Sequence, residues 1–425
     1  MPRRSRRVAV IGGGWAGLAA AVEATQQGDS VTLFEMAPQL GGRSRGVEID
    51  GLMLDNGQHI LIGAYSETLR LMQTVGVKID EVLLRTPLRL IDPQGLGLRL
   101  NPGAPVPQFA AAVLRHGHWR WRDKAALLAA AVSWFVSAFR CEPTRTVAEL
   151  TASLPQAVRD SLIDPLCVAA LNTPANQASG TVFLRILKDA LFSGPGSADL
   201  LLPRVSLSEV LPGPAADWLE RSGATVHLSH RVERLEPQAG SWRVDGEAFN
   251  AVVLANTPPE AARLVEASAP EWSRAAAGLR YEPIVTSYLR SEGARLPEPM
   301  LALRSHAASP AQFVFDRGQL GGPEGLLAFV VSGAQDWVDR GLQATQAAVM
   351  AQANAELRRH LRGPLVAVKT LTEKRATFRC TPGLRRPALR IAPGLHAAGD
   401  HVQGPYPATL EGAVRSGVAA ARGGA

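Results

Sequence analysis

The chain has few cysteines and no apolar run long enough to cross a membrane. Cys141, Cys167 and Cys380 lie far apart and match neither a CxxC pair nor a zinc spacing, so we expect no disulfide framework and no metal site. The same scarcity favours a reducing, cytoplasmic compartment. The most apolar stretch, residues 125–139, is shorter than the roughly 18 residues that span a bilayer.

Positive charge is in excess but is not concentrated in one tract. The net charge of +7 would attract nucleic acid, acidic ligands or an anionic membrane surface. The arginines are dispersed and accompany no nucleic-acid-binding module, so nucleic acid is the least favoured of these partners. With 425 residues, 46% of them hydrophobic, the chain exceeds the size of one core and predicts a folded protein of about two domains.

A complete βαβ unit is predicted at the amino end. Residues 7–11 and 30–34 are typical of buried strands, and residues 18–27 are typical of an alanine-rich helix. The first residues resemble a secretory signal, but consecutive glycines interrupt its apolar run, so we expect no cleaved signal. The turn after the first strand carries a GxGxxG motif formed by Gly12, Gly14 and Gly17.

Each glycine of this motif is expected to have a separate role. Gly12 permits the tight turn, Gly14 lets the backbone approach a pyrophosphate, and Gly17 lets the helix pack closely on the strand. The phosphates would lie at the positive end of the helix. Glu35, at the tip of the second strand, would accept hydrogen bonds from a ribose diol and repel a 2′-phosphate, which favours FAD or NAD over NADP.

Two further segments favour FAD over NAD. Residues 40–44 (LGGRS) offer small residues and a cation, Arg43, for a second contact on the phosphate side. Near the carboxyl end, a short strand at residues 395–397 leads to Gly399 and to Asp400, which is placed to hydrogen-bond the ribityl chain or a hydroxyl on the pyrophosphate side. Two cradles far apart in the sequence suit the length of FAD.

The segment from Tyr406 to Leu410 is expected to open the last helix. A helix start beside the redox end would stabilise negative charge on a reduced flavin. The sequence contains no second GxGxxG motif, so binding of NAD(P)H as a second dinucleotide is not expected. The electron donor stays open.

The run from Gly12 to Arg43 resembles the extended fingerprint of the FAD-dependent amine oxidase and phytoene desaturase superfamily. Residues 54–59 (LDNGQH) look like its D-x-G-x-H element, which faces the isoalloxazine. The strand around Val232 resembles one that contacts the adenine end. The cofactor contacts expected from the residues and from this resemblance are Gly12, Gly14, Trp15, Ala16, Gly17, Glu35, Met36, Gly41, Gly42, Arg43, Gly57, Gln58, His59, Val232, Gly399, Asp400, Ala408, Thr409 and Leu410.

The resemblance implies an α/β fold, in which a Rossmann-like FAD-binding domain carries an inserted α+β substrate domain and a helical cap. Loops are expected at residues 101–107 and 193–196, with mostly helices between them. Buried strands of the nucleotide sheet are expected at residues 223–235, 242–244 and 251–255. Strands of the substrate domain are expected at residues 312–315 and 326–332. The expected limits are 1–85, 211–259 and 367–425 for the FAD-binding domain, and 86–210 and 260–366 for the cap and substrate domain.

Three middle blocks narrow the resemblance. Residues 165–192, 201–235 and 376–387 resemble the squalene-associated FAD-dependent desaturases, or hydroxysqualene dehydroxylases, and the likeness extends over nearly the whole chain. It implies that reduced FAD removes the hydroxyl of hydroxysqualene, giving squalene for hopanoid synthesis. The alternatives are a carotenoid desaturase, an amine oxidase and a non-catalytic prenyl-lipid carrier. An amine oxidase commonly has an aromatic cage beside the flavin, and only 5% of the residues in this chain are aromatic.

The reaction that the resemblance implies would use a polar group in an apolar pocket. An acid or hydrogen-bond donor would assist departure of the allylic hydroxyl, while the flavin delivers hydride. The candidates for this group are His59, His401, Asn172 and Tyr406. A structural histidine or a proton from water or the flavin is the alternative.

The apolar residues 125–139 follow a segment in which Trp119 and Trp121 alternate with arginines. Tryptophan at headgroup depth and arginine near lipid phosphates suit a segment in the membrane interface. The alternative is a buried helix preceded by a basic loop. The first interpretation predicts a peripheral protein on the inner face of the cytoplasmic membrane, which takes its polyprenyl substrate from lipid.

Overall fold

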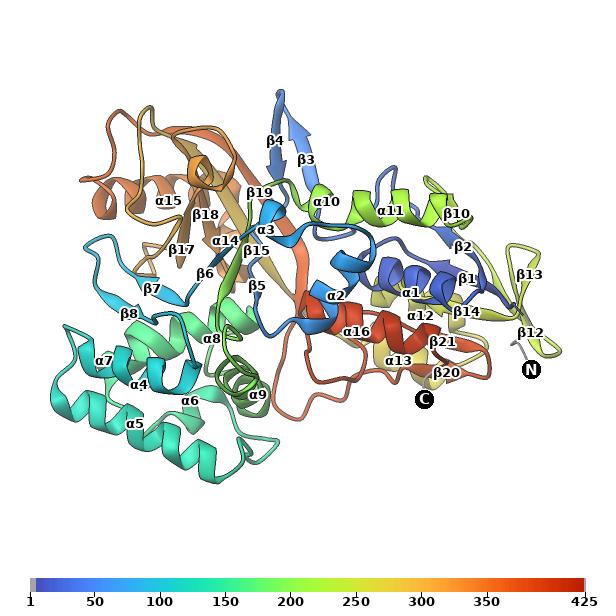
Figure 1. Cartoon of the computed structure of the whole chain (residues 1–425), viewed down its shortest axis with the longest axis horizontal. Coiled ribbons are helices and arrows are strands. Elements are labelled where there is room, and N and C mark those ends of the chain that lie inside the picture. Colours follow the sequence, from blue (N-terminus) through green and yellow to red (C-terminus); the bar gives the residue numbers. More distant parts are fainter. Residues whose placement is uncertain (1–4, 424–425) are drawn as a thin grey trace.

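The computed structural model describes residues 5–423 and has three layered regions (Figure 1). A parallel sheet with helices on both faces holds the two chain ends, a five-stranded antiparallel sheet lies at the other end, and a group of helices lies beside that sheet. Among residues 5–423, no helix combines the length and apolar character needed to cross a membrane.

The parallel sheet has the strand order β10-β2-β1-β14-β21-β20, in which β20 alone runs antiparallel to its neighbour. Its strands are β1 (Arg7–Ile11), β2 (Ser30–Phe34), β10 (Thr225–His227), β14 (Ala251–Leu254), β20 (Arg390–Ala392) and β21 (Leu395–Ala397). The strands predicted at residues 7–11 and 30–34 are confirmed.

Both faces of this sheet are covered because successive side chains of β1 point to opposite sides. Val8 and Val10 pack with α1 (Trp15–Gln26) and α16 (Leu410–Ala421) in one core cluster. Ala9 and Ile11 pack with α12 (Pro258–Val265) and α13 (Pro270–Ala277) in another. The near-continuous apolar sequence of β1 follows from this double burial.

One strand prediction for this sheet was correct in part and another was wrong. Within the segment 223–235, residues 225–227 form β10 of this sheet, but the remainder does not continue it. Residues 242–244 belong to a separate antiparallel sheet of β11 (Leu235–Gln238), β12 (Ser241–Val244) and β13 (Glu247–Phe249). The physical reason is polarity: the amides of Glu233 and Arg234 donate to the Asp245 carboxylate instead of to a neighbouring strand. A buried parallel strand could not accommodate these exposed charged residues.

The antiparallel sheet has the order β16-β17-β18-β15-β19. Its strands are β15 (Tyr281–Arg290), β16 (Met300–Ala302), β17 (Phe313–Asp316), β18 (Leu326–Val331) and β19 (Val366–Phe378). The strands predicted at 312–315 and 326–332 lie within one residue of β17 and β18. One face packs on α15 (Leu342–Glu356), and the other face carries Phe313 and Phe315 into a cluster beside the functional site.

The helical region contains α4 (Pro105–Arg115), α5 (Trp121–Val136), α6 (Val147–Leu150), α7 (Gln156–Val158), α8 (Asp164–Leu171) and α9 (Gly180–Phe192), with a π-helical turn between α7 and α8. The loop predicted at 101–107 ends at residue 104, because proline is tolerated in the first turn of a helix, where its missing N–H is not needed. The helices predicted between residues 107 and 193 are present (Figure 1).

Short elements complete the chain: β3 (Gly46–Ile49), β4 (Leu52–Asp55), β5 (Leu61–Ile62), α2 (Ser66–Thr74), α3 (Ile79–Val82), β6 (Leu83–Thr86), β7 (Arg89–Ile91), β8 (Gly97–Arg99), β9 (Leu200–Pro203), α10 (Leu207–Val210), α11 (Pro212–Arg221), a 3-10 turn (Arg317–Leu320) and α14 (Gln335–Arg340). The predicted domain limits remain a proposal; those at 85/86, 259/260 and 366/367 fall inside β6, α12 and β19.

Candidate functional site

The turn between β1 and α1 forms the first cradle. Gly12 has a φ of 111°, and a Cβ there would lie 2.6 Å from the backbone of Ala255. A Cβ on Gly17 would lie 1.8 Å from the Gly12 carbonyl oxygen, so this glycine brings α1 against the turn. A Cβ on Gly14, by contrast, would meet no atom of the described residues within 4 Å. Two glycines therefore shape the turn, and the third leaves open space in front of it.

The amino end of α1 faces this space. The helix begins at Trp15, three residues before the predicted start. Its N-cap residue is Gly14, which has no side chain to bond the amides of the first turn. Its first turn contains no acidic residue. Uncapped amide groups and the helix dipole make such an end an anion site. The geometry suits a pyrophosphate, as the glycine motif predicts.

Glu35 lies at the carboxyl end of β2 and is buried. Its Oε2 accepts a 2.6 Å hydrogen bond from the Gly13 amide, and its Oε1 accepts one of 2.7 Å from the Ala37 amide. A carboxylate has about four acceptor positions, so it can also accept from a ribose hydroxyl. The two backbone bonds fix the carboxylate beside the first cradle.

Arg43 connects three segments of the chain. The Gly41 amide donates to the Gly13 carbonyl at 2.9 Å, which places this segment against the first cradle. The Arg43 guanidinium then forms a 2.5 Å ion pair with Asp400 and donates to the Ala376 carbonyl at 2.8 Å. The predicted phosphate-side cation is thus already paired with the acid expected to bind the ribityl chain.

This ion pair controls the charge of Asp400. Burial by itself would raise the pKa of the carboxyl group, but Arg43 and the neighbouring His401 lower the pKa well below its usual range. Asp400 is therefore an anion at neutral pH. One of its oxygens is occupied by Arg43, which leaves the second for a ligand hydroxyl.

His59 is held in the neutral form. Burial lowers its pKa to about 4. Its Nδ1 lies 3.2 Å from the Gly57 carbonyl oxygen and must carry the proton, so Nε2 accepts from the Ser44 hydroxyl at 2.9 Å. The neighbouring Gln58 amide donates to the Tyr288 hydroxyl at 2.9 Å. The only ring proton of His59 is committed to the backbone, which makes it a poor proton donor.

Asn172 ends α8 in the left-handed conformation with a φ of 48°. Its Nδ2 donates to the Glu282 carbonyl and to Thr377 Oγ1, each at 3.0 Å, and its Oδ1 accepts from the Gly333 amide at 2.7 Å. These bonds use both donors of the amide. The residue joins the helices to the antiparallel sheet.

Tyr406 lies between two guanidinium groups. Arg185 and Arg415 lie 5.4 and 4.9 Å from its ring centroid. Burial, followed by the nearby Asp189, raises the pKa of the phenol, so Tyr406 is neutral at physiological pH. The segment from Tyr406 does not open the last helix as predicted: α16 begins at Leu410, with Thr409 as its cap and Ala408 at a φ of 56°.

His401 differs from the other three candidates because it has a free polar atom. Its side chain is buried, Nδ1 lies 3.9 Å from Asp400 Oδ1, and Nε2 has no hydrogen-bond partner among the described residues. Its ring packs over Gly399, where a Cβ would lie 2.4 Å from the ring. A buried polar atom without a partner is costly, which favours a ligand contact at this position.

A single cavity of about 1170 Å³ joins all these groups. Every predicted cofactor residue lines it except Gly17, and all four catalytic candidates line it as well. Val232 lies at the border of the cavity, and its backbone carbonyl accepts a hydrogen bond from Arg263. The cavity continues between α4, α5 and α9, where its walls are apolar and include Leu128, Ile186 and Phe135. This volume exceeds the usual range for a single small ligand, roughly 300–1000 Å³.

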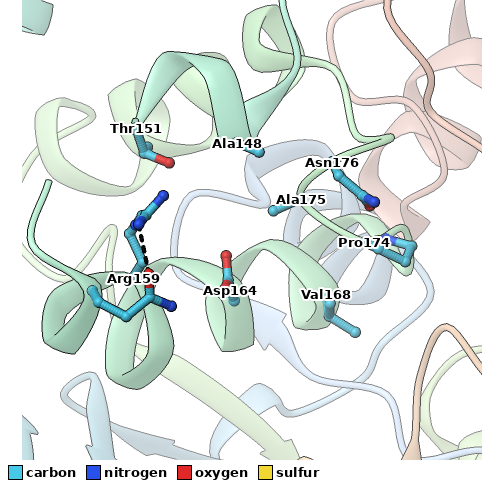
Figure 2. A pocket seen from close by; sticks show the side chains of 9 residues that line it. Ala148, Thr151, Arg159, Asp164, Val168, Pro174, Ala175 and Asn176 are labelled. Atoms are coloured by element: carbon cyan, nitrogen blue, oxygen red, sulfur yellow. Dashed lines mark hydrogen bonds between the residues drawn. The ribbon is translucent and has the colours of Figure 1, made fainter. Parts of the chain in front are cut away.

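A second, smaller cavity of about 300 Å³ lies in the helical region. Figure 2 shows Arg159 and Asp164 beside it, with Thr151 and Asn176 on the opposite side. No site was predicted here. The lining residues belong to elements that pack on each other around the π-helical turn, and this cavity is separate from the one that holds the predicted site.

Sequence reasoning missed several groups in the main cavity. Ser44 holds His59, and Phe139 and Phe192 pack at 5.2 Å near the far end of the cavity. Only the two phenylalanines could have been predicted from the sequence, since aromatic residues recur in the apolar helices. The partner of a serine hydroxyl depends on tertiary contacts.

Comparison with known proteins shows the family of the chain. The model of the family described as "Flavin containing amine oxidoreductase" matches residues 15–423. The hydroxysqualene dehydroxylase of Rhodopseudomonas palustris is 29% identical over 98% of each chain, and that of Sinorhizobium fredii is 28% identical over 98% of this chain and 97% of the relative. The zeta-carotene desaturase of Synechocystis is 27% identical, over 57% of this chain and 54% of its own.

Solved structures give the same fold. An oxidoreductase from Methanosarcina mazei has a TM-score of 0.71 at 16% identity and covers 97% of this chain and 98% of its own. A putrescine oxidase has a TM-score of 0.69 at 17% identity and covers 99% and 98%. At these identities the likeness shows the fold alone. The predicted α/β fold and the predicted resemblance are confirmed.

Proposed function

Because the chain belongs to the flavin-containing amine oxidoreductase family, we propose that it uses FAD to remove the hydroxyl of hydroxysqualene and give squalene for hopanoid synthesis. The chain is an FAD-dependent oxidoreductase, which disfavours the alternative of a non-catalytic lipid carrier. Relatives named hydroxysqualene dehydroxylase match at least 97% of the chain, which supports this substrate over a carotenoid.

The observation that carries the proposal is the shape of the cavity. It begins at the glycine cradle and continues, without interruption, between apolar helices. A polyprenyl alcohol of about thirty carbons has one polar group and a long apolar chain. Polar groups near Gly399 and apolar walls beyond them match that distribution.

The described residues fit FAD. The open space at Gly14 and the uncapped start of α1 would hold the pyrophosphate, and Glu35 would hold a ribose. The free side of Asp400 and the turn before α16 would hold the redox end. When bound in its reduced form, FAD supplies the hydride that replaces the hydroxyl.

His401 is the residue that we propose to assist the leaving hydroxyl. Its Nε2 is a polar atom without a partner on the cavity wall, whereas the protons of His59 and Asn172 are engaged elsewhere. In the doubly protonated form, with Nδ1–H facing Asp400, the ring passes its Nε2 proton to the hydroxyl oxygen, the C–O bond breaks, water leaves, and a neutral imidazole remains. The Asp400 carboxylate, 3.9 Å away, orients the ring. The apolar walls exclude other water from the allylic cation.

Product analysis tests the proposal. The flavoprotein is reduced without oxygen and incubated with hydroxysqualene or with phytoene, and the products are identified by mass spectrometry. We expect squalene from the first and no change in the second. The partial match to zeta-carotene desaturases motivates a parallel incubation of oxidised enzyme with zeta-carotene and with phytoene. A desaturated product there, with no squalene from the reduced enzyme, would reject the proposal in favour of carotenoid desaturation.

An amine oxidase activity is tested in the same preparation. Oxidised enzyme is supplied with oxygen and a series of primary amines, and hydrogen peroxide is measured. We expect none above background, because the cavity beyond Gly399 is lined mainly by apolar rather than charged groups. Sustained peroxide formation would contradict that expectation.

A further inference from the structure

The outward face of α5 is apolar and exposed. The exposed fractions on this face are 73% for Trp121, 62% for Val132, 59% for Phe135 and 78% for Val136. Trp121 and Val132 are about three helical turns apart, so these side chains form one stripe. The opposite face buries Leu127 and Trp134 in the helical core. A surface helix ordinarily turns charged residues outward, so an apolar outer stripe marks an interaction surface.

The stripe coincides with an opening of the main cavity. Val132 and Phe135 line the cavity and are exposed, and the same is true of Val106 on α4 and Phe192 on α9. The rings of Phe135 and Phe192 stack at 5.4 Å across this opening. An entrance with an apolar rim is poorly suited to ligands that arrive from water.

Cations surround the apolar stripe. Arg115, Arg120, Arg122 and Arg140 are exposed. Lys124 lies 5.2 Å from the ring centroid of Trp121. The acid between residues 115 and 140, Asp123, is buried; it accepts from the Arg120 amide and lies 3.8 Å from Arg122 Nε, so it offsets one of these cations and leaves the others in excess.

One predicted member of this surface was wrong. Trp119 is buried: its ring stacks on His116 at 3.8 Å, and its Nε1 donates to Ser161 at 3.0 Å. It anchors the start of α5 to the helical core and cannot reach a membrane. Trp121, two residues later, remains available.

We propose that this face, defined by Trp121, Val132, Phe135 and Val136 and their flanking cations, docks on an anionic lipid bilayer. Trp121 lies at headgroup depth, the cations contact lipid phosphates, and the apolar rim opens toward the hydrocarbon. Lipid then exchanges with the cavity without crossing water. The identity of the lipid substrate rests on the proposed function. The docking surface rests on the exposure of its apolar side chains and on its charge.

Vesicle flotation tests the docking with the flavin-loaded protein and no substrate. Vesicles of phosphatidylcholine alone are compared with vesicles that also contain phosphatidylglycerol. We expect binding to the anionic vesicles and its weakening by salt. Arg120→Gln with Arg122→Gln should weaken binding roughly 30-fold, since each cation contributes about 1 kcal/mol. Phe135→Ser with Val136→Ser should weaken it at least about tenfold.

Matched controls lie elsewhere on the surface. Arg221→Gln with Arg243→Gln removes equal charge from the FAD-binding domain, and Val366→Ser removes an apolar side chain that is 60% exposed on β19. Both should float like the unsubstituted protein. Retention of binding by the α5 variants, or equal loss in the controls, would overturn the proposal. All variants should keep the visible flavin spectrum, which separates lost docking from lost folding.

Two further measurements separate the alternatives. Sedimentation equilibrium without lipid should give the same mass for the unsubstituted protein and for the Phe135→Ser, Val136→Ser variant; a dimer that dissociates in the variant would assign this face to a second copy and overturn lipid docking. Turnover in detergent micelles should survive in the Arg120→Gln, Arg122→Gln variant, whose substituted residues do not line the cavity. Intact flotation without any turnover would reject the proposed reaction and leave the docking in place.

Discussion

Alanine substitution at two glycines of the first cradle separates cofactor binding from packing. At Gly17, a Cβ would lie 1.8 Å from the Gly12 carbonyl oxygen, so α1 must move away from the turn. Overpacking of this kind costs about 1–3 kcal/mol or more. At Gly14 the φ is −74° and the added Cβ meets no described atom within 4 Å, so Gly14→Ala should change the stability of the cofactor-free protein by less than about 1 kcal/mol.

The cofactor reverses this order of effects. The Cβ of Gly14→Ala would occupy the open space before α1, so FAD affinity should fall at least about tenfold, or about 1.4 kcal/mol. FAD at a hundredfold excess over its Kd stabilises the unsubstituted protein by about 2.7 kcal/mol, and much of this gain should be lost in Gly14→Ala.

Urea unfolding with and without FAD, together with flavin fluorescence titration, measures both quantities. Gly17→Ala should lower the midpoint even without FAD, whereas Gly14→Ala should lower only the midpoint with FAD. Normal FAD affinity in Gly14→Ala would refute the assignment of this space to the pyrophosphate. A loss of cofactor-free stability equal to that of Gly17→Ala would refute the packing argument.

Three further predictions concern the charged and polar groups of the cavity. Arg43→Met leaves the buried Asp400 unpaired and should destabilise the protein by about 3 kcal/mol in urea unfolding, with partial recovery in Arg43→Met combined with Asp400→Leu. Because the pKa of Asp400 is lowered in the folded protein, its contribution to the free energy of unfolding is complete above the unfolded pKa near 4 and is lost as pH falls below that value. Unfolding measured against pH should show a smaller loss of stability in acid for Arg43→Met than for the unsubstituted protein. The pKa of His59 is also lowered, to about 4, so its contribution declines as pH falls from about 6.5 toward 4, and His59→Gln should flatten the stability profile in that window; an unchanged slope would contradict its burial in the neutral form. His401→Gln should keep FAD and the visible spectrum but reduce kcat for hydroxysqualene by about 100-fold or more, whereas Asn172→Asp should first lower stability; a full rate in His401→Gln would assign the proton to water or the flavin.

The first cradle was predictable because its determinants are local. The strands 7–11 and 30–34, the glycine turn and Glu35 lie within one βαβ unit. Gly12 and Gly17 lie close to backbone atoms and Gly14 faces open space, as their positions in the motif predict. All but one of the expected cofactor residues line one cavity. These residues could be predicted from the local glycine motif and from the family resemblance. The strand prediction at 242–244 failed because an apolar pattern of three residues does not specify the sheet to which a strand belongs.

The sequence by itself determined the nucleotide-binding unit, the family and the apolar character of the helical region, since these depend on residue types at short spacing. Only the tertiary structure decided which polar groups are free. Arg43 and Asp400 are 357 residues apart in the sequence and were each predicted to bind the ligand. In the structure they form an ion pair with each other. Trp119 and Trp121 are equivalent in the sequence, but the packing of the start of α5 buries the first and exposes the second. Burial and pairing of this kind arise from contacts between distant segments, and no local pattern encodes them.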